Sequence, residues 1–188
     1  MVVTAIIALI TGLVLVSNAT FGGKVLLENL AYDMALSIRQ AQVYGIAVQR
    51  FGNNTFTAGY GVHFQTSSQY SYLTFADALT VNGLYDCPTP GSSATCELVT
   101  NTAIERGFSI SKLCAPAGTN STTCTSVNTI DILFIRPNPD ASISANNLSC
   151  TLGLGTCYDS ARVVVQSPRG DISSILIENN GQITVQKL

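Results

Sequence analysis

The stretches MVVTAIIALITGLVLV (1–16) and KVLLENLAYDMALSIRQAQVYGIAVQR (24–50) decide the fold of this chain. The first carries no charge, and its length suits a helix better than a strand. As a helix it is ~24 Å long, slightly short of the ~30 Å of a bilayer's hydrocarbon core. Two alternatives stay open: a buried strand, and a signal peptide cleaved at Ser17-Asn18-Ala19, although no basic residue precedes the run.

The second stretch has the pattern of an amphipathic helix. Gly22 and Gly23 precede it, and we expect a helix break there because each glycine costs a helix about 1 kcal/mol relative to alanine. Apolar and small residues then recur at alternating steps of four and three, which places them on one helix face. The sequence predicts that this face packs on a sheet and that the helix ends near Gly52. The residues of this predicted docking stripe are Leu27, Ala31, Met34, Ile38, Ala41, Gly45 and Val48.

Beyond residue 53 the hydrophobic period becomes that of strands. Tyr60, Val62 and Phe64 alternate with polar or small residues, as in a half-buried strand. Asn179-Asn180-Gly181 predicts a hairpin with a type I′ turn. The further strands are expected at 70–75, 108–113, 130–135, 161–166, 172–178 and 182–186. We predict an α+β protein with three parts: an apolar helix over 1–23, an amphipathic helix over 24–52, and a β-rich globular domain over 53–188, in which the long helix packs on an antiparallel sheet with disulfide-bonded loops.

Six cysteines fall in three close pairs that bracket loop-like segments, such as CPTPGSSATC. Six cysteines allow fifteen connectivities, and the short spacings favour pairing between neighbours. The expected disulfide residues are Cys87 with Cys96, Cys114 with Cys124, and Cys150 with Cys157. Such bonds predict an oxidising compartment.

Composition and residue types argue against catalysis. Only 11% of residues are charged and the net charge is −2, so nucleic acid is not the first partner to propose. His63 is the only histidine, and it lies in a strand pattern as a surface or half-buried side chain. We expect no enzyme activity, no cofactor and no metal, because no nucleophile–base or acid–base pair stands out.

Three weaker patterns have ordinary explanations. Arg169-Gly170-Asp171 matches a cell-adhesion tripeptide, but after Pro168 it fits a turn. Asp131, Asn138 and Asp140 are too few for a calcium site. The cations that could contact DNA near the C-terminus are Arg162, Arg169 and Lys187, which are too few and too spread for more than weak binding.

The order of these segments resembles the type IV pilin and pseudopilin superfamily. MVVTAIIALITGLVL (1–15) looks like the segment after the Phe-Thr-Leu-Ile-Glu start of mature pilins. NLAYDMALSIRQAQVYGIAVQ (29–49), GYGVHF (59–64) and VVVQSPRGDISSILIENNGQITV (163–185) are similar to the H-type, FimT-like pseudopilin branch. The cleavage site, the N-methylated first residue and the glutamate of that family are expected upstream of Met1.

This resemblance implies the pilin fold and a structural subunit of a type IV pilus-like surface filament, serving adhesion, motility or DNA uptake. The implied partners are copies of itself and other pilins, the inner membrane before assembly, an assembly platform and a prepilin peptidase. The residues expected to pack in the filament core are Val3, Ile6, Ile7, Ile10, Leu13 and Val14. The alternatives are a minor tip pseudopilin that primes a type II secretion pseudopilus, and a membrane-anchored extracellular binding module.

Overall fold

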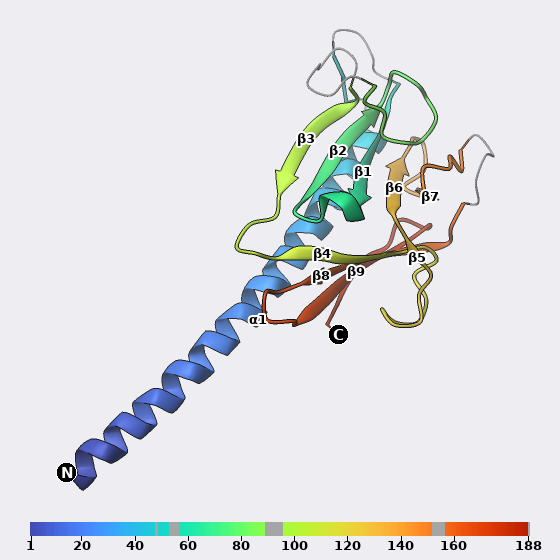
Figure 1. The fold of residues 1–188 in the computed structure, drawn as a ribbon. Coiled ribbons are helices and arrows are strands. Elements are labelled where there is room, and N and C mark those ends of the chain that lie inside the picture. Colours follow the sequence, from blue (N-terminus) through green and yellow to red (C-terminus); the bar gives the residue numbers. More distant parts are fainter. Residues whose placement is uncertain (48, 53–56, 89–95, 152–156, 188) are drawn as a thin grey trace.

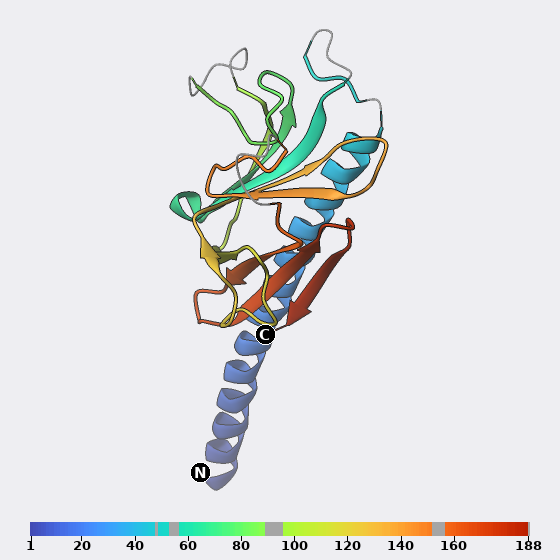
Figure 2. The ribbon, with the colours of Figure 1, turned by 90° about the vertical axis from the view of Figure 1, so that its right-hand side faces the viewer.

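One helix, α1 (Val2–Ile46), dominates the shape of the protein in the computed structural model (Figures 1 and 2). The structure describes residues 1–47, 49–52, 57–88, 96–151 and 157–187, and for residues 15–21 the backbone alone. The N-terminal part of α1 extends away from the globular part, and its C-terminal part lies against two sheets.

The predicted helix break at Gly22 and Gly23 is wrong, because α1 runs through both residues. Two glycines cost a helix roughly 2 kcal/mol together. Long helical segments on both sides offset that cost, since each added residue contributes a hydrogen bond once a helix has formed.

The helix ends at Ile46, earlier than the predicted end near Gly52. Gly45 is the last residue of the docking stripe that contacts the sheet, and a Cβ there would overlap the carbonyl oxygen of Phe134. Ala47 is already extended, with φ −71° and ψ 157°. The chain therefore leaves α1 where the helix meets the sheet, and Val48 lies outside the described residues.

In the described residues, ten strands form two antiparallel sheets of five strands each, with a short 3-10 helix, η1 (Thr66–Ser68), between β1 and β2. The first sheet has the order β3-β2-β1-β6-β7, and the second β10-β9-β8-β4-β5. The strand bounds are β1 Gly59–Gln65, β2 Ser71–Asp77, β3 Leu98–Ala103, β4 Ser109–Cys114, β5 Ser126–Val127, β6 Thr129–Phe134, β7 Ala141–Ala145, β8 Ser160–Gln166, β9 Ile172–Glu178 and β10 Ile183–Lys187.

Two sheets replace the single sheet of the predicted fold, so that prediction of the fold class is wrong. Sheets twist by roughly 20–25° from strand to strand. Ten strands in one sheet would therefore turn away from a straight helix. Two sheets of five strands can each place a face against successive turns of α1, and the chain passes from the first to the second after β3 and again after β7.

One hydrophobic core joins α1 to both sheets. Leu27, Ala31, Met34, Ile38 and Ala41 of the docking stripe are each at most 3% exposed. They belong to the same core cluster as residues of β1 and β6 in the first sheet and of β8 and β9 in the second. The stripe thus packs between two sheets, and its small residues let the backbones approach closely.

Each of the seven predicted strands is present, whereas β3, β5 and β7 were not predicted. β1 is buried on both faces rather than half-buried. The hairpin between β9 and β10 is present, but only Gly181 has a positive φ (82°), so its turn is not the predicted type I′. β3 is exposed, and β7 consists of small residues apart from Ile143, which explains why neither shows a strand pattern of hydrophobicity.

The three disulfide bonds join Cys87 to Cys96, Cys114 to Cys124 and Cys150 to Cys157. Pairing between sequence neighbours is therefore confirmed. Each bond closes a short loop, with sequence separations of 9, 10 and 7 residues. The bonds staple loops at the ends of strands rather than one element to a distant one.

Candidate functional site

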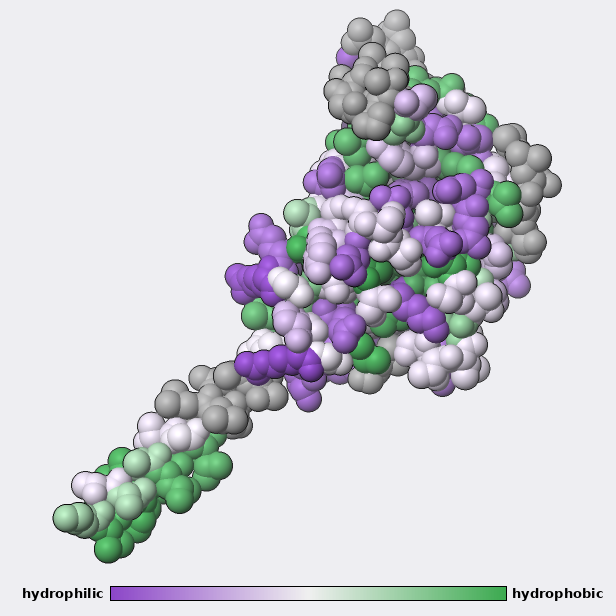
Figure 3. Space-filling model, viewed as in Figure 1, coloured by the Kyte–Doolittle hydropathy of each residue, from purple (hydrophilic) through white to green (hydrophobic). Residues whose placement is uncertain are grey.

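The N-terminal part of α1 is the most unusual surface of the described molecule. We call residues 1–14 the arm. Its side chains are exposed and, apart from Thr4 and Thr11, apolar, and Figure 3 shows this hydrophobic surface projecting from a mixed globular surface. The six residues expected to pack in a filament core all lie in this arm and are exposed by 53–68%: Val3, Ile6, Ile7, Ile10, Leu13 and Val14. An apolar surface of this kind marks an interaction site.

The six residues lie on one side of the arm, since their spacing from Val3 is 3, 4, 7, 10 and 11 residues. The arm's two threonines do not add free hydroxyl donors. Thr4 Oγ1 donates to the carbonyl oxygen of Met1 at 2.7 Å, and Thr11 Oγ1 donates to that of Ile7 at 2.8 Å. The arm can therefore enter an apolar environment without stranding a hydroxyl donor.

A second exposed apolar row continues from the arm along the outer face of α1. We call it the outer stripe: Val25, Tyr32, Leu36 and Val43, which are 39–65% exposed. Steps of seven, four and seven residues keep the row on one line, and steps of eleven and seven lead back to Val14 and Ile7. At 100° per residue this line lies opposite the docking stripe, so α1 is apolar on both sides.

The sequence predicts an apolar membrane or filament-core helix over residues 1–23. Within the described part of the chain, no helix is long and apolar enough to cross a membrane.

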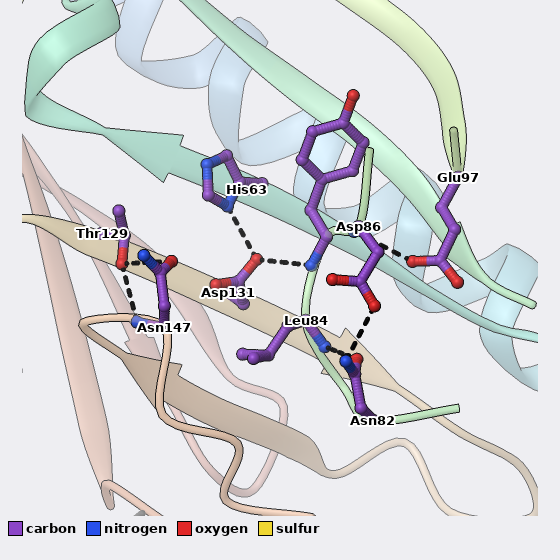
Figure 4. A network of polar contacts seen from close by, with 9 residues as sticks. His63, Asn82, Leu84, Asp86, Glu97, Thr129, Asp131 and Asn147 are labelled. Carbon is purple, nitrogen blue, oxygen red and sulfur yellow. Dashed lines mark hydrogen bonds and ion pairs between the residues drawn. The ribbon is translucent and has the colours of Figure 1, made fainter. Parts of the chain in front are cut away.

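A network of carboxylates around the loop 78–86 is the second candidate site, and Figure 4 shows its members Asp86, Glu97 and Asp131. Glu97 Oε1 accepts hydrogen bonds from the backbone N–H groups of Ala78, Leu79 and Thr80, at 2.8–3.2 Å. Asp77 accepts from the N–H groups of Asn82 and Gly83, both at 3.0 Å. These two carboxylates hold the loop 78–86 against the end of the first sheet.

The pKa of the Asp77 carboxyl group is raised above its ordinary value. This pKa is raised to about 6, chiefly by burial and to a lesser extent by the neighbouring Glu97 and Asp86, while hydrogen bonds from Asn82 and Gly83 oppose the shift. Asp77 and Glu97 are 1% and 0% exposed. No sequence pattern predicts this network, because its members lie on β2, just before β3 and in the loop between them.

His63 is buried, which corrects the expectation of a surface or half-buried side chain. It is 6% exposed, and its Nδ1 lies 2.7 Å from Asp131 Oδ1 on the adjacent strand β6. The same oxygen accepts from the backbone N–H of Tyr85 at 3.1 Å. Asp131 Oδ2 is buried without a hydrogen-bond partner in the described residues. The pair thus anchors the loop 78–86 from the face of the first sheet that lies away from α1.

The remaining candidates are dispersed. Arg162 is 2% exposed and donates to the carbonyl oxygens of Ala117 and Gly118, to Ser174 and to Gln186, so it cannot contact DNA. Arg169 lies in the turn before β9, where Gly170 has φ 91°. Lys187 forms an ion pair with Glu28 of α1 at 2.9 Å. The three cations thus do not form a common surface.

The three residues considered for calcium are likewise separated. Asp131 is buried in β6, whereas Asn138 and Asp140 are exposed in the connection between β6 and β7. The described residues contain no group of three or more histidine, cysteine or acidic side chains that could hold a metal ion.

The chain was also compared with known proteins. No family model, no curated protein and no solved structure matches it. The exposed arm and the outer stripe are therefore the observations on which a function can be argued.

Proposed function

We propose that this protein is a structural subunit of a type IV pilus-like filament on the cell surface, and that it assembles by packing its arm against the arms of other copies. The exposed apolar arm carries this proposal. The sequence resemblance to type IV pilins and pseudopilins supports it independently. The oxidising compartment indicated by three disulfides is consistent with a cell-surface location.

The energetics favour burial of the arm between copies. Fully burying a valine, leucine or isoleucine side chain stabilises an assembly by ~1.5–3 kcal/mol. The six core-packing residues still expose more than half of their surface, so covering that remainder contributes roughly 1–2 kcal/mol for each. A filament repeats this contribution at every subunit.

The outer stripe extends the same surface into the globular half of α1. The docking stripe already fixes one side of the helix to the subunit's own sheets, which leaves Val25, Tyr32, Leu36 and Val43 facing outward. Straight helices that are apolar on two opposite sides suit an assembly in which one side belongs to the subunit and the other to its neighbours.

The test is a pair of substitutions at one arm position. Ile7→Asp places a carboxylate on the core-packing side, and an unpaired buried charge costs several kcal/mol. Ile7→Leu keeps the volume and apolar character and serves as the matched control. We expect filaments in electron micrographs of the wild type and of Ile7→Leu, and none for Ile7→Asp.

The globular part must remain folded in both variants for this result to bear on assembly. Ile7 is 59% exposed and lies outside the core cluster, so thermal unfolding of the domain should not change. Normal filaments from a folded Ile7→Asp variant would refute the proposal.

A further inference from the structure

Two of the four sheet edges, β7 and β10, lie against other described parts of the chain, and a third, β5, is very short. On the outer edge of β7, the N–H of Ala141 donates to the carbonyl oxygen of Asn179. The carbonyl oxygen of Ile143 accepts from the N–H of Tyr158, and that of Ala145 accepts from the N–H of Leu148. β10 lies beside α1, whose Gln42 and Arg39 donate to Gly181 just before it. β5 is only two residues long.

Among the described residues, no backbone group bonds to the outer side of the fourth edge, β3. Five of its six residues are exposed and the sixth is half-buried. In antiparallel pairs the peptide groups of alternate residues point toward and away from the partner strand. Ile104 N–H donates to Tyr70 at 2.7 Å, and the register places Ala103 opposite Ser71. Thr102 and Thr100 therefore bond to β2, while the peptide groups of Asn101 and Ala103 point outward.

This edge lacks most of the features that keep sheet edges from pairing. Proteins protect edges with lysine or other charges, with proline, with bulges or with a covering element. The sequence of β3, LVTNTA, has neither charge nor proline. The pairing of β3 with β2 is irregular only near Leu98 and Val99, because Thr74 pairs with Thr100 and Phe75 with Leu98. Residues Thr100–Ala103 therefore form a regular edge.

We propose that β3 pairs antiparallel with β3 of a second copy of this chain, with Thr102 of one copy opposite Thr102 of the other. In this register Asn101 of each copy faces Ala103 of the other copy. Each of these two pairs exchanges two backbone N–H···O hydrogen bonds, which gives four in total. The pair has no like charges opposite one another, and a Thr–Thr pair across strands is favourable.

This contact differs from packing of the arms. A two-fold axis that reverses β3 also reverses α1, which runs roughly along β3 (Figure 1). The paired copies therefore point their arms in opposite directions, and they cannot be neighbours along one polar filament. The contact joins two unassembled subunits or subunits of separate filaments. Because the paired strands are short, the interface is smaller than a standard one and the association is weak and reversible.

The test removes one outward N–H group. Asn101→Pro deletes the N–H that would donate to the second copy and leaves the β2 ladder intact, since proline is tolerated on an edge strand when its nitrogen faces outward. Asn101→Thr changes the side chain but keeps the N–H, and is the matched control. Sedimentation equilibrium of the full chain in detergent micelles, which cover the arm, measures association over a wide range of protein concentration.

We expect concentration-dependent dimers of the wild type and of Asn101→Thr, and monomers of Asn101→Pro with an unchanged unfolding temperature. Hydrogen exchange of the Asn101 and Ala103 amides should slow as wild-type dimers form. Equal association of both variants, or amides whose exchange does not slow at the highest concentration, would overturn the proposal. Filament formation tested with Ile7→Asp does not depend on this result, so the two proposals can fail separately.

Discussion

Gly45 is the position where α1 and the first sheet are closest, and replacing it with alanine tests that packing. A Cβ at residue 45 would overlap the carbonyl oxygen of Phe134 and lie 2.9 Å from the Cβ of Phe134. The obstructing atoms belong to the backbone and the root of a side chain on β6, so no rotamer change relieves the clash. Helix or strand must move instead, and overpacking of this kind costs ~1–3 kcal/mol.

Alanine also favours the helix by about 1 kcal/mol over glycine, which offsets part of the loss. The clash is with backbone, so we place its cost in the upper part of the range and expect a net destabilisation of roughly 1–2 kcal/mol. For a chain of this size, 1 kcal/mol lowers the unfolding temperature by about 2–4 °C, which predicts a drop of roughly 2–8 °C.

Gly23→Ala is the matched control in the same helix. No atom lies within 4 Å of a Cβ at residue 23, so this variant gains helix propensity without a clash. Thermal unfolding followed by circular dichroism should rank Gly23→Ala at or above the wild type and Gly45→Ala below it. If Gly45→Ala unfolds at or above the temperature of Gly23→Ala, the close approach of α1 to β6 is wrong.

Two further predictions concern buried polar groups. The pKa of Asp77 is raised from 3.8 to about 6, so the folded state holds this proton more tightly than the unfolded state does. Protonated Asp77 therefore stabilises the folded state fully below about pH 4, and this stabilisation is lost as pH rises through 6. The loss amounts to at most ~3 kcal/mol, at 1.36 kcal/mol per pKa unit. Urea unfolding gives the free energy of unfolding of the wild type and of Asp77→Asn at several pH values. The wild-type value minus the Asp77→Asn value should fall as pH rises, and a difference that grows with pH would contradict the prediction. Arg162→Met should destabilise the protein by ~2–4 kcal/mol, since it leaves the buried oxygens of Ala117 and Ser174 without a hydrogen-bond donor. The control Arg106→Met, at an exposed position, should change stability by less than ~0.5 kcal/mol. Equal unfolding temperatures of the two variants would refute a stabilising role of buried Arg162.

The exposed arm could be predicted from the sequence because it consists of residues that are adjacent in the chain. An uncharged run of sixteen residues shows an apolar helix without knowledge of any contact, and the exposed arm is that run. The outer stripe was missed because its members are separated by up to seven residues and alternate with polar side chains. Only after the docking stripe is known to face the sheets does the opposite row stand out as uncovered.

The buried polar groups could not be predicted at all. His63 and Asp131 meet because β1 and β6 pair in a particular register, although 68 residues separate them in the chain. Gln42 of α1 is 7% exposed and donates to the carbonyl oxygen of Pro139 at 2.9 Å, although no local pattern marks it as buried. Such pairs depend on which strands become neighbours, and hydrophobic period carries no information about that choice.

The sequence by itself determined the long helix, seven of the strands and the pairing of the cysteines. Each depends on residues close together in the chain, where spacing and side-chain type act directly. The continuation of α1 through Gly22 and Gly23 follows from helix propagation. The tertiary structure alone decided that the strands divide into two sheets and that β3 is left as an edge strand. These features depend on the free energy of packing distant segments, which outweighs local preferences of about 1 kcal/mol per residue.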